Sequence, residues 1–291
     1  MVAEPSWPEP GPNWPEAKSS WGLAWPIHVY AFASIWTLAA IYFLFFFVQS
    51  IWRRSNEHKR SPLIMLSLQL LIQALSRCFV LFLNPYASRS SNHAQLVITI
   101  AVWSLGTAGL TSAFGVLLLI LLDATKLSLA PPKFQNIYVL IIITIANFAF
   151  VVVSDIIVAF HESANILLVL CQVTFALWGV VITVGYSMAA YRIRKNLTAT
   201  FDGVESGPKT PGDPMRFKWL IIKCCVSSIL GLCVFGMSLY AALFGESSVL
   251  SDTEFADSWP WWVFQTIFRI LEILVTLLIS VVALQTPRVP R

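Results

Sequence analysis

The stretch WWVFQTIFRILEILVTLLISVVAL occupies residues 261–284 and carries the pattern that decides the fold. It is long enough to cross the hydrocarbon core of a bilayer, which takes about 20 apolar residues in an α-helix. Its polar side chains recur at spacings of four and three, which places them on one helix face: Gln265, Arg269, Glu272, Thr276 and Ser280. The stretch therefore predicts a membrane-spanning helix that turns one polar face away from lipid.

Six further apolar runs accompany this one. The chain of 291 residues is 57% hydrophobic and 12% charged, whereas a soluble domain is about 25% charged. Backbone groups inside hydrocarbon have no water to bind, so each run has to form a helix. We predict an all-α membrane protein, a bundle of seven transmembrane helices over about 27–51, 63–83, 95–122, 134–158, 164–190, 219–244 and 261–284.

Lysine and arginine are distributed unevenly over the connections between these helices. One side of the membrane carries Lys18 and Arg89 alone. The other side carries fourteen basic residues: Arg53, Arg54, Lys59, Arg60, Lys126, Lys133, Arg192, Arg194, Lys195, Lys209, Arg216, Lys218, Arg288 and Arg291. Basic residues mark the cytosolic side, so we predict that the N-terminus is outside and the C-terminus is in the cytosol. The net charge of +4 is thus a topology signal and indicates no nucleic-acid partner.

The first 21 residues differ from the rest in being acidic and rich in proline and tryptophan. A segment this rich in proline is not expected to form a packed fold, and its tryptophans are expected at the level of the lipid headgroups. We therefore divide the chain into an extracellular Pro/Trp-rich tail, residues 1–21, and a seven-transmembrane-helix domain, residues 22–291.

Arginine and carboxylate side chains occur inside three of the predicted helices: Arg77 in the second, Asp155 in the fourth, and Arg269 and Glu272 in the seventh. A charge that faces lipid costs about 2.5–3.5 kcal/mol even on the most lenient scale. These groups should therefore face the interior of the bundle, where their formal charges cancel. With Gln265 they form a candidate ligand-binding site in the outer half. Two interpretations stay open: the site joins helix to helix, or it is a polar pocket that opens outward.

Residues that carry catalysis or hold cofactors are missing from the positions where membrane proteins need them. The seventh predicted helix has no lysine for a retinal Schiff base. The four histidines lie at or beyond predicted helix ends, which leaves no intramembrane pair for haem: His28, His58, His93 and His161. The sequence therefore predicts no enzymatic activity, no cofactor and no metal site, and the partner that it does identify is the lipid bilayer.

The sizeable soluble segment of the chain is the predicted third cytosolic loop, about 191–218. It begins with the basic residues Arg192, Arg194 and Lys195 and continues into the Gly/Pro-rich stretch GVESGPKTPGDP, residues 203–214. Glycine and proline without apolar periodicity indicate a flexible loop. The basic residues serve as a topology anchor, or they dock a cytosolic protein partner.

Three stretches of the sequence carry a family resemblance: WGLAWPIHVY at 21–30, SRCFVLFLNPYA at 76–87 and WWVFQTIFRILEI at 261–273. They resemble the seven-helix region of the proline-rich transmembrane proteins, types 3 and 4. The chain departs from that family in its short tail and in Ala87, where glycine is expected. The resemblance implies a multi-pass membrane protein with an extracellular N-terminus and no established enzymatic activity.

These observations favour a non-enzymatic seven-helix protein of the plasma membrane that is receptor-like in topology. The alternative is an accessory subunit or scaffold for another membrane protein. A transporter is less favoured, because the sequence shows no internal repeat and no pair of helices broken by glycine or proline. A deep, open polar pocket would favour ligand binding, and a closed one would favour a scaffold.

The uneven distribution of basic residues predicts the topology of epitope tags. A tag at residue 10 should stain intact cells, and a tag at residue 205 should stain cells only after permeabilisation. Staining of the residue-205 tag on intact cells would contradict the predicted orientation.

Overall fold

The computed structural model describes residues 11–52, 57–89, 93–125, 137–161, 166–202, 214–243 and 255–285. Its elements, in order, are α1 (Trp14–Trp21), α2 (Ala24–Trp52), α3 (Glu57–Leu83), η1 (Pro85–Ala87), α4 (His93–Thr125), α5 (Ile137–Phe160), α6 (Ile166–Asp202), α7 (Pro214–Leu243) and α8 (Ser258–Gln285). Within these ranges, seven helices, α2 to α8, are long and apolar enough to cross a membrane. The predicted all-α architecture with seven spanning segments is confirmed.

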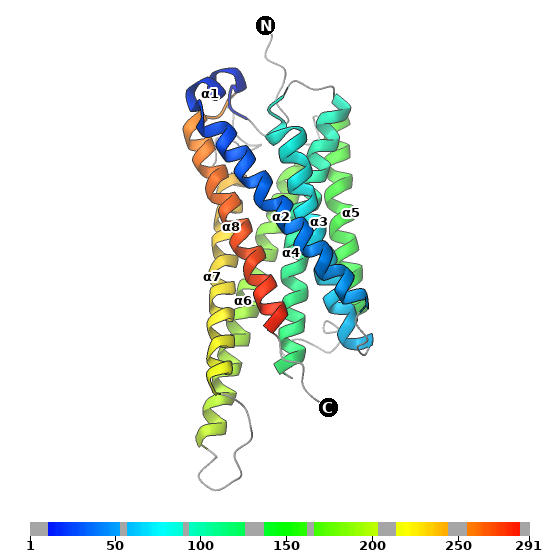
Figure 1. The fold of residues 1–291 in the computed structure, drawn as a ribbon, viewed down its shortest axis with the longest axis vertical. Coiled ribbons are helices and arrows are strands. Elements are labelled where there is room, and N and C mark those ends of the chain that lie inside the picture. The colour runs from blue at the N-terminus through cyan, green and yellow to red at the C-terminus, as the bar shows by residue number, and fades with distance from the viewer. Residues whose placement is uncertain are drawn as a thin grey trace.

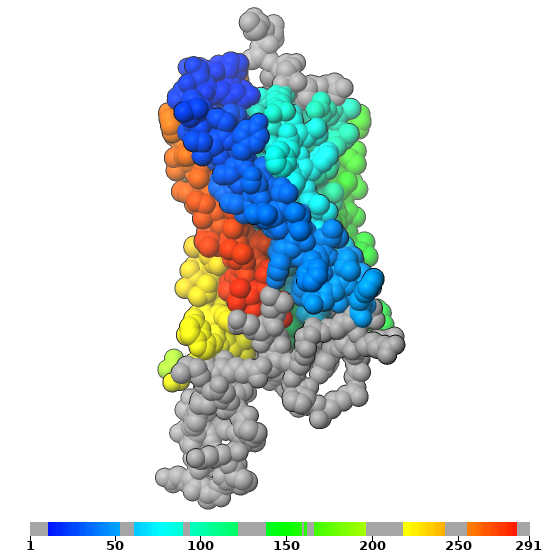
Figure 2. Space-filling view, viewed as in Figure 1, coloured from blue at the N-terminus to red at the C-terminus, as the bar shows by residue number. Residues whose placement is uncertain are grey.

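The helices form a bundle in which α4 occupies a central place (Figure 1). It contacts α3, α5, α6 and α8, while α2 packs along α3 and α6 packs along α7. The short helix α1 lies across the end of the bundle at which α2 and α8 begin (Figures 1 and 2). This arrangement places α3 and α8, far apart in the sequence, both against α4.

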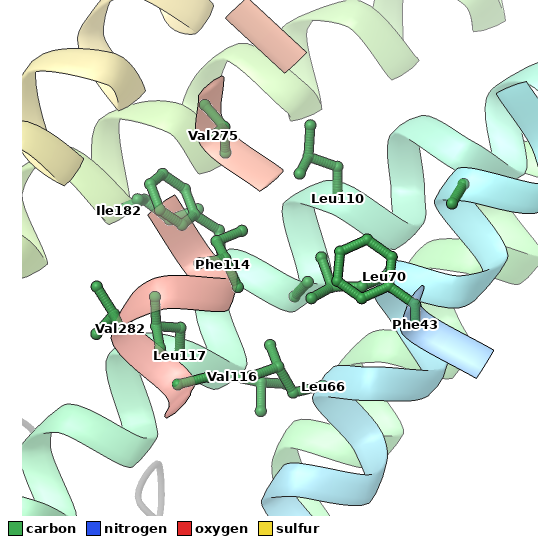
Figure 3. Close-up of a cluster of buried hydrophobic side chains, with 14 of the residues drawn as sticks. Phe43, Leu66, Leu70, Leu110, Phe114, Val116, Leu117, Ile182, Val275 and Val282 are labelled. Atoms are coloured by element: carbon green, nitrogen blue, oxygen red, sulfur yellow. The ribbon is translucent and has the colours of Figure 1, made fainter. Parts of the chain in front are cut away.

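Apolar side chains from α2, α3, α4, α6 and α8 meet in one cluster between the helices (Figure 3). Trp36, Leu66 and Leu117 are fully buried there. Lipid tails are as apolar as these side chains, so the cluster is held by close packing more than by exclusion from water. Outward-facing residues such as Leu38 and Ile41, both well exposed on α2, fit a surface that contacts lipid.

Two glycines allow α4 to approach α3 closely. A Cβ atom added at Gly106 would lie 2.1 Å from the Oγ of Ser76, and one at Gly109 would lie 2.9 Å from the backbone oxygen of Gln69. Small residues at a helix contact permit this approach. The polar face of α3 is thereby placed directly against the backbone of α4.

The expectation that residues 1–21 are unpacked is wrong for Trp14–Trp21, which form α1. Proline is tolerated in the first turn of a helix, where backbone N–H groups have no internal partner. Trp21 is buried, and its ring stacks on Trp25 and Trp261 at centroid distances of 5.1 and 5.8 Å. The tryptophans therefore bind one another, and this tertiary packing overrides the composition of the segment.

The expectation of a loop from residue 191 is also wrong, because α6 continues to Asp202. Arginine, lysine and leucine favour helices, and the first glycine after them is Gly203. The basic residues Arg192, Arg194 and Lys195 are thus exposed within the last turns of α6. By contrast, the predicted end of the second span at residue 83 is confirmed, since α3 ends at Leu83.

The packing of α1 predicts the effect of removing its buried tryptophan. Trp21→Ala should release α1 from the bundle, because losing a buried tryptophan costs about 3–5 kcal/mol in a packed core. We expect trypsin to cleave faster after Lys18. The cleavage rate is measured from the appearance of the fragment that begins at Ser19. Trp52→Ala is the matched control, since Trp52 is 83% exposed at the far end of α2. Equal cleavage rates in both variants would show that Trp21 does not hold α1 in place.

Candidate functional site

An ion pair between Arg77 of α3 and Glu272 of α8 lies at the centre of the polar residues inside the bundle. Arg77 Nη2 donates to Glu272 Oε1 at 2.7 Å, and Arg77 Nε donates to Oε2 at 3.3 Å. This two-point geometry is the strong form of an arginine–carboxylate contact. Both side chains are almost completely buried, so the pair ties α3 to α8 away from solvent.

Arg269, one helical turn before Glu272, binds the same carboxylate. Its Nη1 donates to Glu272 Oε2, an i,i+3 contact within α8. Residues at this spacing lie on one helix face. Glu272 therefore serves two guanidinium groups at once, and we name Arg77, Arg269 and Glu272 the ion trio.

Helix α4 supplies the remaining partners of the ion trio. Arg77 Nη1 donates to the backbone oxygen of Trp103 at 2.6 Å, and Nη2 donates to Thr107 Oγ1 at 2.8 Å. The guanidinium carbons of Arg77 and Arg269 lie 4.0 and 4.4 Å from the centroid of the Trp103 ring. A tryptophan face attracts cations, by about 2 kcal/mol or more when water is excluded. The contact depends on Gly106, whose added Cβ would lie 3.1 Å from Arg77 Nη1.

The polar column continues inward from the ion trio along α3 and α8. Thr276 Oγ1 donates to the backbone oxygen of Glu272 at 2.7 Å and lies 3.2 Å from Gln73 Oε1. Gln69, one turn further along α3, is also buried. The second and seventh predicted spans therefore face each other through their polar stripes, as their spacing indicates.

Toward the end of the bundle that carries α1, the ion trio is covered by a second polar contact and by aromatic rings. His28 Nε2 lies 2.8 Å from the hydroxyl of Tyr86, and His28 Nδ1 lies 3.0 Å from Thr266 Oγ1. The Tyr86 ring contacts Trp103 on one side and Trp261 on another, at centroid distances of 5.4 and 5.3 Å. Burial raises the pKa of Tyr86, which keeps its hydroxyl neutral in this cover.

Aromatic contacts thus run without a break from α1 to the ion trio. Trp21 of α1 stacks on Trp261, Trp261 meets Tyr86, Tyr86 meets Trp103, and Trp103 covers both guanidinium groups. The described residues enclose the trio, whose side chains are 0–3% exposed. The polar pocket that opens outward, one of the two interpretations of the sequence, is not the arrangement seen.

The ion trio carries a formal charge of +1, because Asp155 is not part of it. Asp155 is buried on α5, and α5 packs against α4 and α6. Both ion pairs of the trio use Glu272. The expected cancellation of two arginines by two carboxylates is therefore not realised at this site, and the Nε of Arg269 has no hydrogen-bond partner among the described residues.

The other candidate residues lie apart from the trio. Gln265 is half-buried one turn along α8, and no hydrogen bond within the described residues joins it to the trio. Arg192, Arg194 and Lys195 lie at the far end of α6. They belong to a different surface, at the opposite end of the bundle from α1 (Figure 1).

Sequence reasoning missed three members of the site: His28, Tyr86 and Trp103. His28 was assigned to a helix end, although α2 begins at Ala24 and buries it. Tyr86 entered the sequence analysis only within the family-resemblance stretch at 76–87. The signal for Tyr86 in the sequence was its place directly after Asn84 and Pro85. A chain that turns sharply at these residues brings the Tyr86 ring back against the bundle.

The chemistry open to this arrangement is binding and electrostatic support. The ion trio offers no hydroxyl, thiol or amine placed as a nucleophile. Within the residues that the structure describes, no group of three histidine, cysteine, aspartate or glutamate side chains could hold a metal ion. Two guanidinium groups that share one carboxylate are suited to fixing helices or to attracting a further anion.

The family model described as proline-rich transmembrane protein 3 domain matches residues 2–291. The match covers the seven-helix bundle together with α1. No curated protein and no solved structure matches the chain.

The shared carboxylate predicts an unequal response to mutation within the ion trio. Glu272→Leu strands two buried guanidinium groups, and breaking one buried pair typically costs about 3–5 kcal/mol. We expect the monodisperse protein peak in detergent to fall strongly. Adding Arg77→Leu should restore it in part, and adding Arg269→Leu as well should restore most of it, because apolar replacement of a whole buried pair can be nearly neutral.

Leu274→Ala is the matched control for this series, since Leu274 lies on the same helix and is 45% exposed. It should leave the peak unchanged. Normal folding of Glu272→Leu would contradict a structural role for the trio.

Proposed function

Because the chain belongs to the proline-rich transmembrane protein 3 family, a multi-pass membrane family not known for enzymes, we propose that it is a non-enzymatic scaffold or accessory subunit for another membrane protein. The enclosure of the ion trio carries this proposal. Its strongest polar groups are bound to one another and covered by aromatic rings. A buried site whose charged groups bind one another across two helices holds a bundle in one shape, which is what a scaffold requires.

We place this scaffold in the plasma membrane with α1 outside and the basic end of α6 in the cytosol. The fourteen-to-two distribution of basic residues supports this orientation. Arg192, Arg194 and Lys195 then lie on the cytosolic side, exposed and on a helix that continues to Asp202. A helix end holds charged groups at fixed positions, so less conformational entropy is lost when an acidic partner surface binds.

A receptor function is the second candidate, and one observation favours it. The ion trio has a formal charge of +1, and Arg269 Nε is buried without a hydrogen-bond partner among the described residues. A small anionic ligand would complete the charge balance. In that case the present arrangement is the closed state, and α1 with its aromatic contacts would have to move before the ligand binds.

The scaffold proposal predicts that a cytosolic partner depends on the basic end of α6. Replacing Arg192, Arg194 and Lys195 together by glutamine should remove a defined protein from the set labelled by a proximity enzyme inserted at residue 205. The loss should be at least fivefold, because three charged contacts at an interface are withdrawn at once.

The matched control is Lys218→Gln, which removes an exposed charge from the start of α7 on the same side. Tags at residues 10 and 205 verify that each variant keeps its orientation. An unchanged set of labelled proteins in the triple variant would overturn the docking role and leave these residues as topology anchors. Stabilisation of the wild type by a small anion, lost in Arg269→Gln, would favour the receptor instead.

A further inference from the structure

A hollow of about 150 Å³ lies beside α1, separate from the ion trio. It is lined by α1, by the first turns of α2 and by the segment that follows α3; its lining residues are Lys18, Trp25, Pro26, Val29, Tyr30, Pro85, Ser88 and Arg89. We name it the basic hollow. It combines positive charge with an apolar wall on a membrane-spanning helix.

Both basic residues that the sequence assigns to this side of the membrane meet in the basic hollow. Lys18 and Arg89 come from separate segments, yet they line one small volume. Their proximity has an energetic cost: burial, and then the charge of Arg89, lower the pKa of Lys18. Two like charges brought together in this way create a local demand for an anion.

The hydrogen bonds of the two cations do not neutralise them. Lys18 Nζ donates to the backbone oxygen of Ser88 at 2.6 Å, and Arg89 Nη1 donates to that of Leu83 at 2.9 Å. Both acceptors are neutral carbonyls. Among the described residues, neither Lys18 nor Arg89 forms an ion pair with a carboxylate.

Ser88 provides a second, independent indication that the hollow can bind a ligand. The residue is 5% exposed and lines the hollow, and its Oγ has no hydrogen-bond partner among the described residues. A buried hydroxyl without a partner costs about 1–3 kcal/mol. A hydroxyl donor beside an ammonium and a guanidinium is a donor set that suits a phosphate group.

The wall of the basic hollow faces lipid. Tyr30 lines it and is 57% exposed, and Ile27, on the same helix, is 65% exposed. Both belong to α2, which has the length and composition of a membrane span. Trp25 and Tyr30 are residue types that concentrate where lipid headgroups meet hydrocarbon. The cations therefore lie at headgroup level with an acyl-chain surface directly below.

We propose that the basic hollow binds the phosphate group of a membrane phospholipid, with Lys18, Arg89 and Ser88 as the donors and the start of α2 as the surface for the acyl chain. Since Lys18 belongs to α1 and Arg89 follows η1, a lipid bound to both fastens α1 to the bundle. This inference does not rest on the scaffold or receptor function, because the ion trio does not line the hollow.

Native mass spectrometry of the full chain in detergent tests this inference. The probe is dioleoyl-phosphatidylglycerol; the comparison compounds are dioleoylglycerol, which keeps the acyl chains without phosphate, and inorganic phosphate, which lacks the chains. We expect one phosphatidylglycerol to remain bound to the wild type, and at least fivefold lower occupancy by dioleoylglycerol. Inorganic phosphate at millimolar concentration should not displace the lipid.

Ser88→Ala and Arg89→Gln are the informative variants. Ser88→Ala removes a hydroxyl that has no protein partner, so the Tm without lipid should stay unchanged while lipid occupancy falls at least threefold. Arg89→Gln should lower occupancy at least fivefold. Lys18→Arg, which keeps the charge, should retain the lipid, and Lys218→Gln, at the opposite end of the bundle, is the matched control.

Three outcomes would overturn the proposal. Equal occupancy by dioleoylglycerol would mean that the chains alone bind. Displacement by inorganic phosphate at millimolar concentration would make the hollow a site for free anions. Unchanged lipid retention in both Ser88→Ala and Arg89→Gln would place the bound lipid elsewhere on the protein.

Discussion

The structure depends on one constraint: a carboxylate inside a membrane has to find its cations within the protein. Glu272 lies on a helix with the length of a membrane span, and Arg77 meets it from α3 at 2.7 Å. In hydrocarbon, the alternative for either group is exposure to a medium that offers no hydrogen bond. The pair therefore fixes which faces of α3 and α8 meet and how far along their axes they are aligned. The position of α4 follows, since its backbone has to accept the remaining Arg77 N–H at Trp103.

The ion trio has one more positive than negative charge. Polar backbone and hydroxyl groups and an aromatic ring face stabilise this charge in place of a second carboxylate. The backbone oxygen of Trp103 and the hydroxyl of Thr107 accept from Arg77, and the Trp103 ring covers both guanidinium groups. Such partners disperse a positive charge without the desolvation cost of burying another anion. They also need close approach, which explains the place of Gly106 opposite Arg77. The same contacts that stabilise the charge thus determine the spacing of α3 and α4.

The seven spans could be predicted from sequence because bilayer thickness sets the length of an apolar run, and the polar spacing in residues 261–284 gave the correct inward face. The inward position of Arg77, Arg269 and Glu272 followed from the same periodicity and from the cost of placing a charge in lipid. Asp155 was misplaced because periodicity assigns a helix face but not which neighbouring helix that face meets. The α1 helix was missed because composition does not show that Trp21 finds Trp25 and Trp261. The contact between His28 and Tyr86 was missed for a similar reason. It depends on a turn in which Tyr86 and Ala87 take a positive φ of 54°, which composition does not reveal.

The short helix α1 links the two polar centres and so decides between the candidate functions. Its Trp21 begins the aromatic contacts that cover the ion trio, and its Lys18 lines the basic hollow. A ligand could reach the ion trio only in molecules in which α1 has moved away from the bundle. Its apparent affinity is then its intrinsic affinity multiplied by the fraction of molecules in that open state. If docking of α1 is worth about 3–5 kcal/mol, as a buried tryptophan suggests, that fraction is about 10⁻² to 10⁻⁴. A lipid that fastens α1 lowers it further, whereas a scaffold needs no such opening. The energetics of this one helix therefore favour a protein whose surface at this end of the bundle is fixed.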